Sequence, residues 1–230
     1  SINPFAFPPS ISATEHMEAL LNLLSTCWPM YAAMSAILKQ AMIRVYEEAG
    51  WDLELGCSMD EEPRFPTFRD LMAVLPEMIE RSDYSDEVKG NYKGALLTRV
   101  QSMTNGTNQR IFCRQETGDE VLFNGNVILD LSHVGSQETL ALIMGVLVLR
   151  LDEFRRSEQL GSNLPLRHVT VLEEAHNLLS ARQVTAPGEG ASVGEKSVEM
   201  ITRAIAQMRT YGEGFLIVDQ TPSALSEAVN

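Results

Sequence analysis

The spacing of apolar residues changes about halfway along the chain. In the first half, apolar residues recur every three or four positions, which is the period of an amphipathic helix. The stretches with this spacing cover residues 12–27, 30–48, 67–81 and 86–103. Polar segments rich in glycine, proline or acidic residues separate them. We therefore expect residues 1–115 to form a separate all-α subdomain, in which Pro76 should kink or split the third helix.

In the second half, short apolar runs alternate with stretches of helical period. The runs are NVILDL, HVTVL and FLIVD, at residues 126–131, 168–172 and 215–219. Helical stretches lie at about residues 137–158 and 196–210. Strands that alternate with helices and lack polar–apolar alternation are typical of a mostly parallel sheet covered on both faces. We expect residues 116–230 to have this α/β fold.

The composition is that of an acidic globular protein. The 230 residues include 18 Lys or Arg and 31 Asp or Glu, a net charge of −13. This excludes binding of nucleic acid by bulk charge, because phosphate binding requires clustered Lys and Arg. The three cysteines have no spacing typical of a disulfide or zinc framework, so we expect a cytoplasmic protein. The longest apolar run, residues 140–149, is about half the length of a membrane span, which predicts no membrane segment.

Two adjacent carboxylates follow the second apolar run directly. Glu173 and Glu174 come after HVTVL, and the carboxyl end of a parallel strand lies at the ligand-binding edge of its sheet. One carboxylate there can hold Mg²⁺ through water while the other polarises an attacking water. The alternative is an ordinary helix start, where the helix dipole favours glutamate. From these residues alone, both interpretations stay open.

An amide follows the third run in the same way. Gln220 ends the stretch FLIVDQ, at a point where an amide can contact a γ-phosphate or orient a water. The alternative is a turn residue that satisfies the local backbone.

Three motifs and their order carry a resemblance to a known family. The motifs are HVTVLEEAH, MRTYGEG and FLIVDQTPS, at residues 168–176, 208–214 and 215–223. Together they resemble the HerA and VirB4 branch of the FtsK–HerA P-loop ATPases, whose pattern is a strand with E-E-A-H, then R-x-Y-G-x-G, then a strand ending in D-Q-x-P. Residues 126–155 resemble the family's strand ending in D-L-S and its long following helix. The segments INPF and YEEAGWD resemble the helical insertion of a bacterial subgroup.

The resemblance implies a partial RecA-like core, with residues 1–115 as a helical insertion and residues 116–230 as the carboxyl-terminal part of the core. It also implies ATP and Mg²⁺ as cofactors. Glu173 would be the Mg²⁺-associated acid, Glu174 the water-activating acid, and Gln220 the γ-phosphate sensor.

Two further residues have weaker assignments from the resemblance. Arg209 would be a finger that reaches a neighbouring subunit's nucleotide; the alternative is a solvated helix charge. His176 would couple nucleotide state to DNA; the alternative is a local cap or stacking contact.

The phosphate-binding loop of the family is absent from these residues. No G-x-x-x-x-G-K-[ST] motif occurs, and the nearest string, GEGASVGEKS at residues 188–197, has the wrong spacing and follows the wrong strand. In relatives this loop precedes the INPF segment. We therefore expect the chain to be part of a longer protein, and residues 1–230 alone to lack ATPase activity.

For the intact protein, the resemblance implies an ATP-driven motor of HerA type. It would form a hexameric ring, move double-stranded DNA and serve a partner nuclease. The alternative is a VirB4-like secretion or conjugation ATPase. A third possibility is a non-catalytic scaffold whose helical part is an interaction module.

Overall fold

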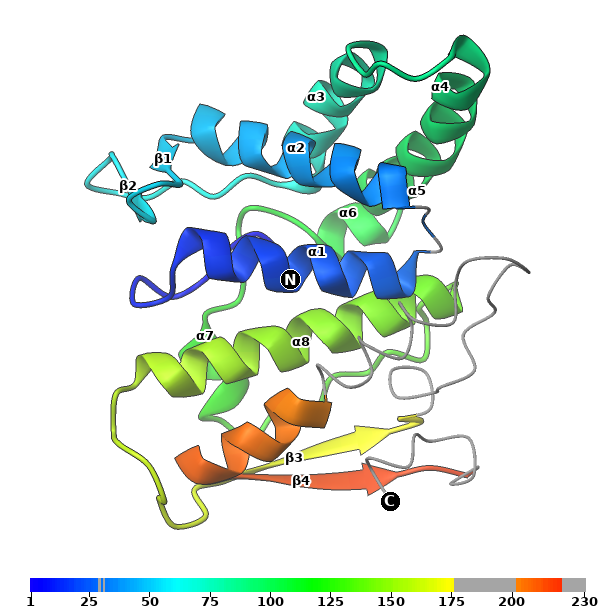
Figure 1. Cartoon of the computed structure of the whole chain (residues 1–230). Coiled ribbons are helices and arrows are strands. Elements are labelled where there is room, and N and C mark those ends of the chain that lie inside the picture. The colour runs from blue at the N-terminus through cyan, green and yellow to red at the C-terminus, as the bar shows by residue number, and fades with distance from the viewer. Residues whose placement is uncertain (29, 31, 176–201, 221–230) are drawn as a thin grey trace. The chain divides into compact units, whose positions relative to one another are not determined.

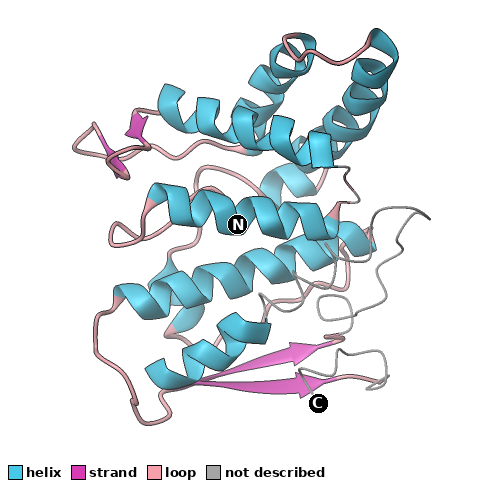
Figure 2. Cartoon of the chain, in the orientation of Figure 1, coloured by secondary structure: helices cyan, strands magenta, loops and turns pink. Residues whose placement is uncertain are grey.

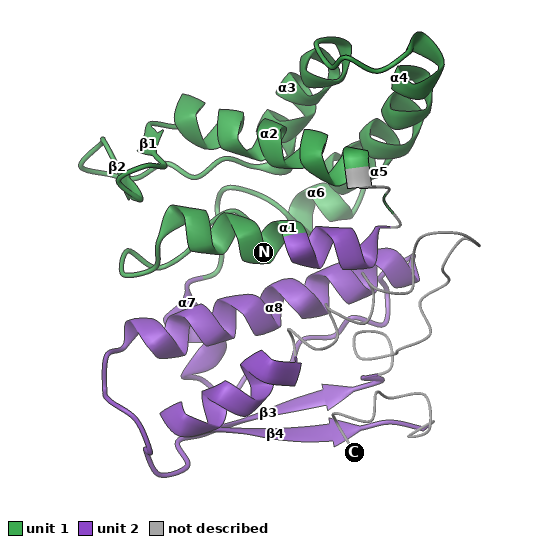
Figure 3. Cartoon of the chain, viewed as in Figure 1, with its two compact units in different colours: residues 1–21, 30–117 green, residues 22–29, 118–230 purple. Residues whose placement is uncertain are grey.

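A computed structural model describes residues 1–28, 30, 32–175 and 202–220. The chain divides into two compact units, shown in Figure 3. Unit 1 contains residues 1–21 and 30–117, and unit 2 contains residues 22–29 and 118–230. Helix α1 (Ala13–Cys27) is shared between them. That unit 1 is an insertion in a larger fold stays a prediction.

Unit 1 is helical apart from one small hairpin (Figure 2). Its further helices are α2 (Ala32–Glu48), α3 (Phe68–Glu80), α4 (Asp86–Tyr92), the π-helical turn η1 (Lys93–Leu97), α5 (Thr98–Thr104) and α6 (Asn108–Ile111). Strands β1 (Trp51–Asp52) and β2 (Cys57–Ser58) pair antiparallel within the predicted loop after α2. The helical character of this half is therefore as predicted.

Helix α3 shows how sequence and packing cooperate in unit 1. Thr67 caps its first turn in a capping box with Asp70, whose carboxylate accepts from the Thr67 backbone N–H at 2.8 Å. The helix continues through Pro76, so this proline does not split it, and a kink there stays a prediction. The buried face, which includes Leu71 and Leu75, holds the helix together because tertiary packing outweighs local propensity.

Unit 2 combines helices with a parallel pair of strands. Its elements are α7 (Asp119–Phe123), α8 (Gln137–Ser157), β3 (His168–Glu173), a helix at residues 202–208, the 3₁₀ turn η2 (Arg209–Tyr211) and β4 (Glu213–Val218). Strands β3 and β4 run parallel from the pair His168–Glu213 to the pair Glu173–Val218. In Figure 1, α8 and the helix at residues 202–208 lie on the same side of the two strands. The predicted α/β class with parallel strands is confirmed.

Two details of the predicted sheet are wrong. Residues 126–131 form no strand, and the side chain of Ile128 is 96 % exposed. A strand is stable only when it pairs, and no described strand pairs with this segment. The sheet is also not covered on both faces by the described residues. Val169 and Val171 of β3 and Leu216 and Val218 of β4 are exposed and share one face.

Candidate functional site

The carboxyl ends of β3 and β4 bring two of the predicted site residues into contact. Glu174 follows β3 directly, and Gln220 lies two residues beyond β4. The Gln220 Nε2 group donates a hydrogen bond to Glu174 Oε1 at 3.1 Å. Both side chains are exposed, so they remain accessible to solvent and to a ligand. The contact arises because parallel strands deliver their following residues to the same edge.

The backbone of Glu174 has an uncommon conformation. Its φ angle is +52°, in the left-handed region that a glutamate seldom adopts. Such a conformation costs on the order of 1–3 kcal/mol, and residues that keep it cluster at functional sites. Here the left-handed residue ends β3 and turns the chain at the point where Glu174 meets Gln220. This strain is an observation independent of the motif, and it supports a functional role for Glu174.

Glu173 is the last residue of β3 and is exposed beside Glu174. Its Cα partner in the sheet is Val218. No group of three or more metal-binding side chains occurs in the described part of the chain. Mg²⁺ does not require one, because it commonly binds through one or two carboxylates and completes its shell with water and phosphate oxygens. The adjacent carboxylates therefore fit a magnesium–nucleotide complex, with Glu173 and Glu174 as the residues that would hold it.

Arg209 lies at the other edge of the same strand pair. It begins η2, immediately before the start of β4. The length of the strand places it roughly 17 Å along the sheet from the carboxyl edge, at about 3.3 Å per residue. There it lines an open pocket of about 500 Å³ with apolar side chains that include Leu166 and Phe215. The structure thus does not bring Arg209 to Glu174 of its own chain, and its role as a finger stays a prediction.

His176 and the loop at residues 188–197 lie outside the described residues.

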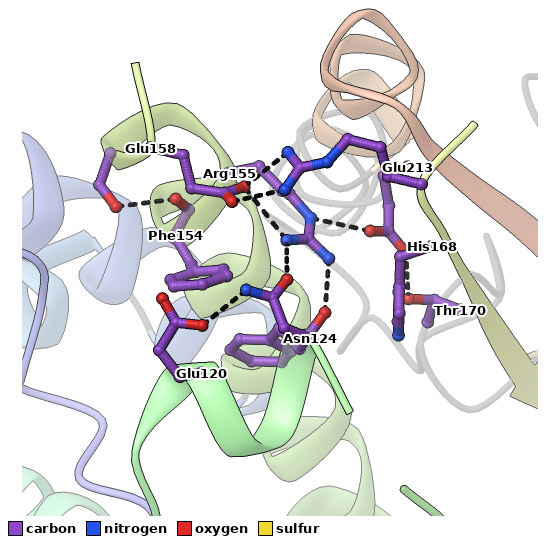
Figure 4. A network of polar contacts seen from close by, with 11 residues as sticks. Glu120, Asn124, Phe154, Arg155, Glu158, His168, Thr170 and Glu213 are labelled. Atoms are coloured by element: carbon purple, nitrogen blue, oxygen red, sulfur yellow. Dashed lines mark hydrogen bonds and ion pairs between the residues drawn. The ribbon is translucent and has the colours of Figure 1, made fainter. Parts of the chain in front are cut away.

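A buried polar network that the motifs did not indicate lies at the amino ends of the strands (Figure 4). The Glu213 side chain is 0 % exposed and the Arg155 side chain 1 %. Arg155 Nε donates to Glu213 Oε2 at 2.9 Å. The other oxygen, Oε1, accepts from Thr170 Oγ1 at 2.7 Å and lies 2.7 Å from His168 Nδ1. We call these four residues the Glu213 network; its sequence signal is a charged residue between two glycines at a strand start.

The remaining donors of Arg155 tie this network to other elements. Its Nη1 group donates to Asn124 Oδ1 at 2.8 Å and to Glu158 Oε2 at 3.1 Å, and its Nη2 group donates to the Phe123 carbonyl at 2.5 Å. Glu158 also binds Arg167 at 2.8 Å. Burial raises the pKa of Glu158, but the hydrogen bonds from Arg167 and Arg155 outweigh it, and the pKa is lowered below its usual 4.5. The buried guanidinium is therefore well paired.

The chain is similar to a known protein in its fold. No family model matches the chain, and no curated protein matches it in sequence. Among solved structures, the chain is similar to VirB4 of Thermoanaerobacter pseudethanolicus, with a TM-score of 0.67 and 16 % identity. The likeness covers 100 % of this chain and 56 % of that one, so the chain spans about half the length of the solved VirB4. At this identity the likeness establishes a shared fold.

The fold is thus a mixed α/β architecture consistent with part of a RecA-like core. Within the predicted branch, the likeness is to the VirB4 side, and nothing in it singles out HerA. In the described residues, no helix has the length and apolarity required to cross a membrane.

Proposed function

We propose that this chain is part of a P-loop ATPase that hydrolyses the γ-phosphate bond of ATP. The observation that carries the proposal is the Gln220–Glu174 hydrogen bond at the carboxyl edge of two parallel strands. An acid that orients water and an amide that contacts the terminal phosphate must lie within reach of the same few atoms. The strained backbone of Glu174 supports the same assignment.

Each residue has a distinct role in this proposal. The Glu174 carboxylate orients the attacking water and accepts its proton. The Gln220 amide reports the γ-phosphate to Glu174 through the hydrogen bond between them. Glu173 would hold Mg²⁺ through bound water. The metal, when bound with ATP, neutralises charge on the phosphate oxygens. The phosphate-binding loop would come from a part of the protein outside these 230 residues.

Of the two predicted kinds of motor, a VirB4-like secretion or conjugation ATPase has the better support. The likeness to the solved VirB4 extends over the entire chain, including the helical unit 1. The HerA alternative, a hexameric translocase of double-stranded DNA with a partner nuclease, rests on the motif resemblance alone. The net charge of −13 also offers no general attraction for DNA.

The test is an ATPase assay of the intact protein and three single variants. We expect Glu174→Gln to lower kcat by at least about 100-fold, because a positioned general base contributes 10²–10⁴-fold. Glu173→Gln should raise the Mg²⁺ concentration needed for half-maximal turnover. Glu54→Gln, an exposed carboxylate in unit 1, is the matched control and should behave as wild type. Wild-type turnover by Glu174→Gln would overturn the proposal.

Adding double-stranded DNA to the same assay separates the two kinds of motor. A VirB4-like ATPase should hydrolyse ATP at the same rate with and without DNA. Strong stimulation by DNA would instead favour the HerA alternative.

A further inference from the structure

We propose that the Glu213 network is a positioning device that keeps β3 and β4 in the register required for the Glu174–Gln220 contact. This inference rests on the proposed ATPase function. It concerns residues at the amino edge of the strand pair, which do not touch the nucleotide-binding edge.

The contacts of Glu213 join both strands at one point. Glu213 is the first residue of β4 and lies opposite His168, the first residue of β3. Its carboxylate contacts His168 and Thr170, which are two residues apart and therefore on the same face of β3. A single buried carboxylate thus contacts two side chains that follow one another on the same face of the neighbouring strand.

This geometry selects one register. A slip of one residue would turn Glu213 to the opposite face of the sheet, away from Thr170 and Arg155. A slip of two residues would keep the face but move the carboxylate by about 7 Å along β3, beyond hydrogen-bonding distance. Only the observed register satisfies both oxygens of Glu213.

The far end of the strand pair depends on the same register. Glu173 lies opposite Val218, and the next residues along the two strands lead to Glu174 and Gln220. Their contact is a single hydrogen bond between two exposed side chains, which is too weak to align the strands by itself. The alignment must therefore come from elsewhere in the pair.

The apolar residues on one face of the strand pair supply little of that alignment. One face of the pair is exposed at Val169, Val171, Leu216 and Val218, so burial does not distinguish the registers on that side. Leaving a buried carboxylate unpaired is costly, so registers in which Glu213 loses Arg155 are disfavoured. Arg155 adds an anchor, since it also binds Asn124 and the Phe123 carbonyl.

The test uses two variants of the intact protein. Thr170→Val removes one hydrogen bond to Glu213 without changing side-chain shape, and Glu213→Gln removes the charge. Both should lower kcat, by between about 10- and 100-fold, because small misplacements at a reacting centre have effects of this size. The KM for ATP should stay within about twofold, since the changes leave ground-state binding intact.

Thr26→Val is the matched control for Thr170→Val, because it makes the same substitution away from the Glu213 network. The Thr26 side chain is buried in unit 2, and its hydroxyl donates to the Asn22 carbonyl of its own helix at 2.7 Å. The same hydroxyl deletion there should leave kcat unchanged. A drop in kcat with Thr26→Val equal to that with Thr170→Val would overturn the positioning role.

A double-mutant cycle shows whether the network acts through Gln220. Once Gln220→Ala has removed the amide, Thr170→Val should lower kcat by much less than it does in the wild-type background. Full additivity of the two effects would contradict the proposal.

Hydrogen exchange separates this inference from the ATPase assignment. In nucleotide-free protein, Thr170→Val should speed exchange at the β4 amides of residues 215–218, and Thr26→Val should not. If the wild-type protein has no turnover, the proposed function fails, and the exchange result still decides whether the network aligns the strands. If turnover is normal and Thr170→Val leaves both kcat and exchange unchanged, the positioning role fails and the proposed function stands.

Discussion

The two compact units differ in what they bury and in what they expose. Unit 1 has an aromatic interior, in which Trp51 stacks on Phe65 at 5.2 Å and the Tyr46 hydroxyl donates to the Phe5 carbonyl. In unit 2, by contrast, the interior contains charge. Among the described residues, every buried Arg, Asp and Glu side chain belongs to unit 2: Arg150, Asp152, Glu153, Arg155 and Glu213.

The surfaces of the two units also differ, in the number of apolar side chains that they expose. Unit 2 exposes apolar side chains on its two strands and at residues 127–129, whereas unit 1 exposes only a few, such as Leu55 and Met59. Unit 1 thus follows the usual preference for apolar interiors, and unit 2 departs from it on α8 and at the start of β4. The difference means that ion pairing contributes to the interior of unit 2 and apolar packing dominates the interior of unit 1.

The largest expected effect on stability is in unit 2. Arg155→Met leaves the Glu213 carboxylate buried without its main cation and should lower the free energy of unfolding by about 3–5 kcal/mol. The double variant Arg155→Met/Glu213→Leu should recover most of this loss. Denaturant unfolding measures both. The control is Arg44→Ala, which breaks an exposed ion pair with Glu48 in unit 1 and should change nothing measurable.

A backbone change in unit 2 should have the next largest effect. Gly212 has a φ of +81°, and a Cβ atom there would lie 2.4 Å from the Pro165 carbonyl oxygen. Gly212→Ala should therefore cost about 2 kcal/mol or more. Trp28 reports on unit 2 and Trp51 on unit 1. In single-tryptophan proteins, the unfolding midpoint seen by Trp28 should fall further than that seen by Trp51; equal shifts would contradict the division into units.

A smaller effect is expected from the helix cap in unit 1. Thr67→Ala removes the hydroxyl that accepts from the Arg69 backbone N–H and should cost about 1 kcal/mol. Trp51 fluorescence should detect the loss more strongly than Trp28 fluorescence. Thr67→Ser, which keeps the cap oxygen, should restore wild-type stability.

The smallest effect is a dependence on acid. The pKa of Glu158 is lowered in the folded protein, chiefly because Arg167 and Arg155 overcome the effect of burial. Glu158 therefore contributes stability fully above its unfolded pKa of about 4.5, and this contribution is lost as pH falls through the lower folded value. Glu158→Gln should reduce the difference in melting temperature between pH 7 and pH 3; an unchanged difference would contradict the ion pairs.

The sequence predicted those elements whose start, end and apolar spacing are all set by neighbouring residues. The long helix expected at residues 137–158 is α8, which begins after the Ser136 cap and ends at Ser157. The strand expected at residues 126–131 is wrong, because strand formation depends on a partner and not on β propensity alone. Strand β4 starts at Glu213, two residues before the predicted run, and Glu213 belongs to the buried network, whose local signal is a charge between two glycines.

Part of the candidate site was also predictable from the sequence. The rule that parallel strands end at one edge places Glu174 and Gln220 together, and the structure shows their hydrogen bond. Their catalytic roles stay predictions. The left-handed backbone of Glu174 and the contacts of Glu213 depend on tertiary structure, so the sequence alone could not indicate them.

The most direct test of the account is single-turnover hydrolysis of ATP by the intact protein, comparing wild type with Glu174→Gln. We predict that the variant still binds ATP and Mg²⁺, keeps its melting temperature, and hydrolyses at least about 100-fold more slowly. Hydrolysis by the variant at the wild-type rate would show that the carboxyl edge of β3 and β4 is not the catalytic site.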